Sequence, residues 1–195
     1  MNKLSPARRR IEIFRAADAV DNGSPQGIRG GGTATDETRA KLKVLRDAGR
    51  DDGIVSSLLY HQQDGFSIVH LWVKPHYPLP RHSHDSDCLY YVVNGEITYG
   101  IETLRASDGF FVPAGIDYVY TGGPEGGELI EVRFGVNNIE TDLPSQSDRR
   151  YERELELIKA NHAAWAKMTM APTFAANLKG RQQESASEPA GTASQ

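Results

Sequence analysis

Residues 80–95 have the sequence PRHSHDSDCLYYVVNG, and this stretch decides the fold. His82 and His84 are separated by one residue. Side chains alternate along an extended strand, so two imidazoles at this spacing point to the same face. Neutral imidazole is the commonest metal ligand in proteins. The pair therefore predicts one edge of a divalent-metal site or one wall of a polar pocket.

The segments on both sides of this stretch have the composition of short strands separated by turns. Asn94-Gly95 predicts a hairpin, because this dipeptide accepts the positive φ angles of a two-residue turn. Gly122 to Gly127 predicts a tight loop, and Pro113-Ala114-Gly115 ends an apolar run. Many short strands with regular turn signals are typical of an all-β sandwich or barrel. The expected strands cover residues 55–60, 66–74, 89–93, 96–99, 110–112, 117–121 and 129–134.

Helical periodicity is found near both ends of the chain. Residues 36–48 have helical spacing, with Thr35 or Asp36 as the cap and Gly49 as the terminator. Residues 148–168 carry an apolar stripe at spacings of four and three, formed by Tyr151, Leu155, Ile158, His162 and Trp165. We expect an N-terminal extension with a flexible Gly-rich segment and a short helix (1–52), a barrel (53–137), a C-terminal helical segment (138–178) and a disordered tail (179–195).

Composition excludes several classes of protein. The chain has 195 residues and a formal net charge of −4, without a basic field that would attract nucleic acid. No apolar run approaches the roughly 20 residues that span a bilayer, and no signal-peptide core follows the N-terminus. The single cysteine excludes an intrachain disulfide framework. We therefore expect a cytoplasmic protein that binds neither nucleic acid nor membranes.

The spacing of the motifs resembles that of the cupin superfamily. The first cupin motif is Gly, five residues, His-x-His, three or four residues, Glu, six residues and Gly. His82, His84 and Gly95 match it, whereas His76 stands at the first Gly position and Cys88 at the Glu position. The second motif is Gly, five residues, Pro-x-Gly, two residues, His, three residues and Asn.

The second motif is matched by Pro113-Ala114-Gly115, but Tyr118 stands at its His position and Gly122 at its Asn position. The resemblance covers about residues 54–136. It implies an all-β, cupin-type double-stranded β-helix, which is a jelly-roll barrel, with flanking helices at both ends. Cupins include isomerases, lyases, dioxygenases, decarboxylases and sugar-binding regulators, so the fold alone does not define the reaction.

The resemblance also implies a set of metal ligands. Metal cupins use three His and one Glu to bind iron, manganese, nickel or zinc, and this chain keeps His82 and His84. Cys88 as thiolate would favour zinc or iron, and Tyr118 as phenolate needs a metal to draw off its proton. We expect Fe²⁺ first, with Zn²⁺, Mn²⁺ or Ni²⁺ as alternatives, or no metal. In the metal-free alternative, the two His residues line a pocket and Cys88 is a small buried filler.

Further candidates depend on which way their strands face. Tyr90 shares strand parity with Cys88 and should point inward. Glu131 is a possible general base if its side chain points inward, which parity alone leaves open. Arg81 and Arg133 are candidates for binding a substrate carboxylate. His70, His76 and His162, which lie outside the His-x-His pair, are spare imidazoles or packing residues.

Three functions follow from these residues. The first, which we favour, is a metal-dependent dioxygenase or lyase that acts on a small oxygen-rich substrate, with His82, His84 and Tyr118 as catalytic residues. The second is a metal-free isomerase or lyase that uses Tyr118 and a His as acid and base. The third is a non-catalytic module that binds a small ligand. We expect a homodimer that forms through a sheet edge or the terminal helix.

Overall fold

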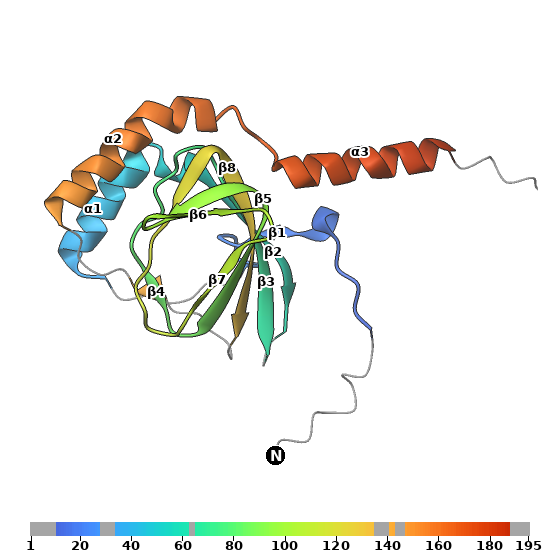
Figure 1. The fold of residues 1–195 in the computed structure, drawn as a ribbon, viewed down its shortest axis with the longest axis horizontal. Helices are drawn as coiled ribbons and strands as arrows, with labels where there is room; N and C mark the ends of the chain where they lie inside the picture. Colours follow the sequence, from blue (N-terminus) through green and yellow to red (C-terminus); the bar gives the residue numbers. More distant parts are fainter. Residues whose placement is uncertain (1–10, 28–33, 63–64, 135–140, 143–146, 188–195) are drawn as a thin grey trace, which may run out of the picture.

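The fold is an antiparallel β-barrel with helices on its outside, shown by a computed structural model (Figure 1). The structure describes residues 11–27, 34–62, 65–134, 141–142 and 147–187. Its strands are β1 (Val20–Asp21), β2 (Ile54–His61), β3 (Phe66–Val73), β4 (Ser83–His84), β5 (Asp87–Tyr99), β6 (Glu102–Arg105), β7 (Gly109–Val112), β8 (Thr121–Phe134) and β9 (Thr141–Asp142). Its helices are α1 (Asp36–Asp47), α2 (Asp148–Trp165) and α3 (Pro172–Ser187), with short 3-10 helices η2 (Ala16–Asp18) and η3 (Arg50–Gly53).

The main sheet has seven strands in the order β1-β2-β3-β8-β5-β6, and β7 also pairs with β5. Strand β8 lies between β3 and β5, so Val69, Glu131 and Tyr90 are aligned in register across three distant segments. Cross-strand neighbours point to the same face of a sheet. All three side chains are buried, and Val69 and Tyr90 belong to the hydrophobic core, which identifies this as the inner face. The predicted all-β barrel with flanking helices is confirmed.

The hairpin predicted at Asn94-Gly95 is wrong. Strand β5 runs without a break from Asp87 to Tyr99, and the chain reverses at Gly100 and Ile101. The pairing of β5 with β8 shifts register on both sides of Gly95, which has φ +66°. A side chain at Gly95 would collide with the carbonyl oxygen of Gly126. The Asn-Gly signal therefore marks an irregularity within a continuous strand, where Gly95 takes the positive φ that a glycine bulge requires.

The tight loop predicted over Gly122 to Gly127 is also wrong, because β8 continues through this segment. Gly122 pairs with Ile97 of β5. A side chain there would collide with the carbonyl oxygen of Lys74. The glycines thus permit the close approach of neighbouring backbones, which is a second common use of glycine in strands.

The two helices α1 and α2 lie side by side against one side of the barrel (Figure 1). Thr35 caps α1 by accepting a hydrogen bond from the backbone N–H of Thr38 at 3.1 Å, as predicted. Gly49 ends the helix region with φ +98°. Helix α2 buries Ile158 and Trp165 in the core, so its apolar stripe packs as expected.

A buried lysine fastens the end of α2 to the barrel. Lys74, which follows β3, donates from Nζ to the carbonyl oxygens of Trp165 at 2.7 Å and Met168 at 2.8 Å. Burial lowers the pKa of Lys74. The last carbonyls of a helix have no partner within the helix and carry the negative end of its dipole. The carbonyl oxygen of Trp165 also accepts from the backbone N–H of Met168, so the ammonium group adds a second, charged donor there.

Helix α3 starts on the outer face of the sheet and leads away from the barrel (Figure 1). Its first turn is held by Glu128 of β8, which accepts hydrogen bonds from the backbone N–H of Thr173 at 3.1 Å and from Asn94 Nδ2 at 2.8 Å. His70 Nε2 lies 3.0 Å from the same carboxylate. This outer cluster fixes where the C-terminal segment begins.

The C-terminal boundary differs from the expectation. Residues 179–187 belong to α3, whereas the sequence predicts a disordered tail from 179; residues 188–195 lie outside the described residues. Part of the predicted Gly-rich segment, 28–33, is also outside them. None of the helices in the described part of the chain combines the length and apolar character that a membrane span requires.

Candidate active site

The structure brings His82, His84 and Tyr118 together inside the barrel. His82 precedes β4 and forms an isolated bridge with Tyr118, in which the backbone N–H of Tyr118 donates to the carbonyl oxygen of His82 at 2.9 Å. The ring centroids of His82 and Tyr118 are 4.3 Å apart, and those of the two His residues are 5.0 Å apart. All three side chains are buried. The bridge therefore places the residue at the missing His position against the His-x-His pair.

The tautomer of His82 follows from its partner. Its Nδ1 lies 2.8 Å from the carbonyl oxygen of Pro80. A carbonyl only accepts, so Nδ1 carries the hydrogen and Nε2 carries the lone pair of the neutral ring. Burial lowers the pKa of His82, so the ring is neutral at pH 7. A His fixed by a backbone carbonyl in this way is arranged as metal-binding His residues are.

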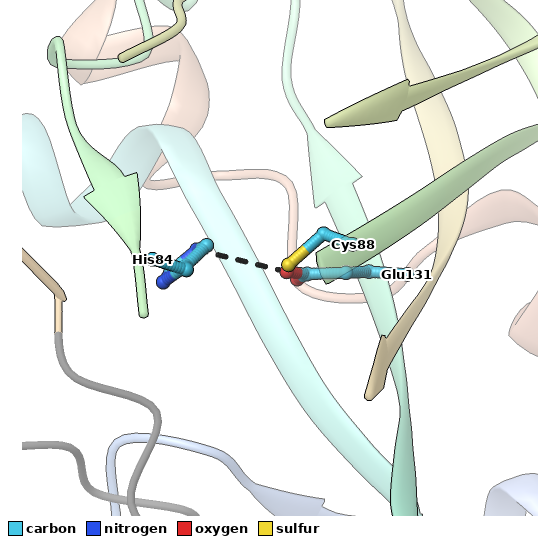
Figure 2. A group of neighbouring side chains, drawn as sticks. All are labelled: His84, Cys88 and Glu131. Atoms are coloured by element: carbon cyan, nitrogen blue, oxygen red, sulfur yellow. Dashed lines mark ion pairs between the residues drawn. The ribbon is translucent and has the colours of Figure 1, made fainter. Parts of the chain in front are cut away.

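His84, Cys88 and Glu131 form a compact group of potential metal ligands (Figure 2). One ligand atom from each residue lies within 4.8 Å of the other two, and all three residues are buried. They come from β4, β5 and β8. His84 Nε2 lies 3.7 Å from Glu131 Oε1. This group contains His84 and Cys88 from the predicted ligand set and adds Glu131, which the sequence indicated only as a possible base.

The thiol of Cys88 is protonated in the absence of a metal. Burial, followed by the negative charge of Glu131, raises its pKa to about 12. Its Sγ donates a weak hydrogen bond to the carbonyl oxygen of Ser86 at 3.5 Å. The thiol is therefore inert as a nucleophile at pH 7. A metal that binds here has to displace this proton.

Glu131 is ionised in spite of its burial. Burial alone would raise the pKa of its carboxyl group, but the charge and hydrogen bonds of Arg133, with smaller contributions from His84 and Tyr90, lower it below its usual range. Arg133 Nε donates to Oε1 at 2.5 Å and Nη2 donates to Oε2 at 3.0 Å. Arg133 is thus engaged with Glu131 and is not available for the substrate carboxylate that the sequence suggested.

Two phenols extend this ion pair toward His82. Tyr90, which points inward as predicted, donates from its hydroxyl to Glu131 Oε1 at 2.7 Å. The hydroxyls of Tyr90 and Tyr118 are also hydrogen bonded to each other. Tyr90 has one hydroxyl hydrogen, which Glu131 accepts, so Tyr118 donates to Tyr90. Burial raises the pKa of both phenols well above the usual value, so both keep their protons at neutral pH.

Aromatic rings close the interior around these polar groups. Phe110 stacks on Tyr90 with ring centroids 4.5 Å apart and an interplanar angle of 8°. Tyr120 lies edge-on to both rings. Such a wall excludes water, which strengthens the electrostatic interactions inside.

The remaining candidates lie elsewhere. His70 is on the outer face beside Glu128, and His76 is exposed on the loop after β3. His162 is half-buried on α2. Arg81 pairs with Asp117 at 3.0 Å near the surface.

The donor atoms of the group fit a divalent metal. Imidazole nitrogen, thiolate sulfur and carboxylate oxygen together are ligands of zinc and iron. Tyr118 is less suited than Glu131, because the phenol holds its proton far more tightly than the carboxyl group does. Arg133 is the feature that opposes metal binding, since a metal would share the carboxylate with the guanidinium. His84, Cys88 and Glu131 would hold such a metal, and Glu131 would then bind it while paired with Arg133.

The chain was compared with known proteins. No protein-family model and no curated protein matches its sequence. Among solved structures, an RmlC-like cupin from Shewanella frigidimarina is 28% identical, with 44% of this chain and 78% of that chain covered and a TM-score of 0.39. The polyketide cyclase RemF from Streptomyces resistomycificus is 18% identical, with 54% and 84% covered and a TM-score of 0.45. KdgF from a Halomonas species is 20% identical, with 43% and 81% covered and a TM-score of 0.39. These likenesses concern the fold, and the roles of the site residues are argued from this chain alone.

Proposed function

We propose that this protein is a cupin-type small-molecule enzyme whose centre holds a divalent metal on His84, Cys88 and Glu131. The observation that carries the proposal is the convergence of three buried ligand atoms from three strands within 4.8 Å. Zinc or ferrous iron suits this mixed donor set, with Fe²⁺ the first choice for oxygenase chemistry and Zn²⁺ for lyase chemistry. When bound, the metal would supply a Lewis acid that polarises an oxygen of the substrate.

The other residues have separate roles in this proposal. The ring of His82 lies 5.0 Å from that of His84 between centroids, and its Nε2 lone pair can serve as a further ligand or as a proton acceptor because Nδ1 carries the hydrogen. Tyr118 packs its ring against His82, and its hydroxyl proton, which Tyr90 accepts in this structure, can turn to the substrate when Tyr118 acts as an acid. Tyr90 and Glu131 then set the orientation of that hydroxyl. Dioxygenase or lyase chemistry on a small oxygen-rich molecule is the proposed reaction class.

Elemental mass spectrometry of the purified full chain tests the metal. Protein reconstituted with Fe²⁺ or Zn²⁺ and then desalted should contain about one metal per chain. The variants His84→Ala and Cys88→Ala should lose it, whereas His76→Asn should keep it. His76 is the matched control, because it is an imidazole outside the group and its φ of +59° suits Asn. The proposal fails if the natural protein takes up no metal or if a His84→Ala, Cys88→Ala double variant retains it.

A second function has its own observation, which is the hydrogen-bonded series from Tyr118 through Tyr90 to Glu131. We propose as the alternative a metal-free isomerase or lyase in which Tyr118 is the acid and His82 the base. In that case the reconstituted protein contains no metal. A small carboxylic acid that binds beside Tyr118 and His82 should then change its affinity as His82 ionises. The Tyr118→Phe variant should bind this acid more weakly. Equal affinity of the natural protein and Tyr118→Phe would exclude this role of the phenol.

A further inference from the structure

An open cleft of about 810 Å³ lies between the barrel and helix α2, apart from the group of His84, Cys88 and Glu131. One wall is formed by the first turns of α2 and the other by the adjoining ends of β5 and β8, with His76 at its edge. A cavity of this volume is in the range of small-molecule sites. The charged and hydrogen-bonding side chains on its walls determine which ligand it would bind.

The α2 wall carries a concentration of positive charge. Arg149, Arg150 and Arg153 all line the cleft. Residues three and four apart lie on the same face of a helix, so Arg153 is a neighbour of both other arginines. Arg150 Nε donates to the buried carboxylate of Glu154 at 2.8 Å. Arg149 and Arg153 are exposed, and within the described residues neither has an ion-pair partner.

This arrangement is unfavourable for the helix itself. Like charges at i and i+4, as in Arg149 and Arg153, repel each other. Cations in the first turns also oppose the helix dipole, whose positive end is at the N-terminus. The formal charge of the whole chain is −4, so the cleft is a local exception to the overall charge. Asp148 in the first turn offsets part of the dipole cost, and an anion in the cleft would reduce what remains of both.

The opposite wall offers neutral hydrogen-bonding groups. Thr98 of β5 and Thr121 of β8 are cross-strand partners in the sheet, and both line the cleft. Directly opposed residues point to the same face, so their hydroxyls are presented together. A ligand with anionic groups at one end and hydroxyl or carbonyl oxygens at the other would match both walls.

We propose that this cleft binds a small organic polyanion, with Arg149 and Arg153 as the anion-binding residues. The shared chemistry is a cluster of anionic oxygens, which phosphate groups and neighbouring carboxylates both provide. Guanidinium groups bind either one through paired hydrogen bonds. The site is distinct from the proposed metal centre and does not depend on it.

Calorimetric titration of the full chain with two probes, pyrophosphate and citrate, tests the proposal and separates the two sources of charge. We expect at least one probe to bind with a dissociation constant below roughly 1 mM at low salt. The double variant Arg149→Gln, Arg153→Gln should bind it at least about tenfold more weakly, because two charge-assisted contacts are lost. Tighter binding of pyrophosphate assigns a phosphate group to the ligand, and tighter binding of citrate assigns carboxylates.

The control variant is Arg39→Gln, Arg46→Gln, which removes the same charge from the exposed surface of α1. It should bind the probe as tightly as the natural protein. His84→Ala should also leave the affinity unchanged, since the metal centre is a different site. The proposal is overturned if neither probe binds, if the α1 control weakens binding as much as the cleft variant, or if His84→Ala abolishes binding.

Discussion

Replacement of Arg133 by Met should destabilise the protein severely, because it leaves a buried carboxylate without its counter-charge. Glu131 has an exposed fraction of 1% and accepts two hydrogen bonds from Arg133. After the change it keeps the Tyr90 hydroxyl and the more distant His84. Breaking a buried pair by removing one partner costs about 3–5 kcal/mol. That is a large part of a typical unfolding free energy of about 5–15 kcal/mol.

The double variant Arg133→Met, Glu131→Gln should recover most of this loss. The amide that Glu131→Gln introduces is neutral and still accepts the Tyr90 hydrogen bond, and Met fills much of the volume of the arginine stem. Replacement of a whole buried ion pair is often close to neutral. We therefore expect the double variant to be at least about 2 kcal/mol more stable than the single variant.

Urea unfolding followed by the fluorescence of the two buried tryptophans, Trp72 and Trp165, measures these differences. Chelator is present throughout, because a bound metal would add its own stabilisation. Arg105→Met is the matched control, since Arg105 pairs with Glu96 at 3.1 Å on the surface and should cost less than about 1 kcal/mol. The reasoning is refuted if Arg133→Met costs no more than the control, or if the double variant is no more stable than the single one.

Three further results are expected. Burial opposes ionisation of Glu128, but its hydrogen bonds lower the pKa of the carboxyl group below its ordinary value of 4.5. The stability that Glu128 contributes is therefore complete above about pH 4.5 and is lost as the pH falls through the lowered pKa. The variant Glu128→Gln should lose less stability in acid, measured by urea unfolding, and should show weaker hydrogen-exchange protection at Thr173. Lys74→Met removes two charge-assisted hydrogen bonds, to the carbonyls of Trp165 at the end of α2 and of Met168 just beyond it, and should lower the unfolding free energy by about 2–3 kcal/mol. Gly95→Ala places a Cβ against the carbonyl oxygen of Gly126 at a positive φ. If this costs about 2 kcal/mol or more, the midpoint of thermal unfolding should fall by roughly 4 °C or more. Gly100→Ala is the comparison, because a Cβ there meets no other atom.

The sequence was sufficient for the barrel because motif spacing constrains chain geometry. His82 and His84 at i and i+2 must share a strand face, and Pro113-Ala114-Gly115 breaks the strand that precedes Tyr118. The His-x-His pair and Tyr118 were therefore expected close together, and the structure brings their rings into contact. The homodimer and the cytoplasmic location stay predictions.

The turn predicted from glycine was wrong where glycine serves another structural purpose. Asn94-Gly95 suits a type I′ turn and a β-bulge equally well, because both need a positive φ. The choice depends on whether a partner strand continues past the dipeptide, and β8 does. That information is in the pairing of distant segments and not in the dipeptide.

Glu131 shows the same limit at the site. Its strand carries apolar and charged residues on both faces, since Glu128 is buried on the outer face and Glu131 on the inner face. Alternation of polar and apolar residues therefore could not assign an inner face to β8. The nearby Arg133, two residues later on the same strand face, was the signal that could have identified a buried ion pair.

The two carboxylates of β8 also bear on how the chain finds its pairing during folding. Slippage of β8 by one residue between β3 and β5 would exchange its faces. Glu131 would leave Tyr90, Glu128 would leave Thr173 and His70, and both charges would lose their partners in the same event. An uncompensated charge in the interior is among the most costly errors a fold can make. The two buried carboxylates therefore make a one-residue register shift of β8 costly. A strand with apolar residues at both positions could shift its register at little cost.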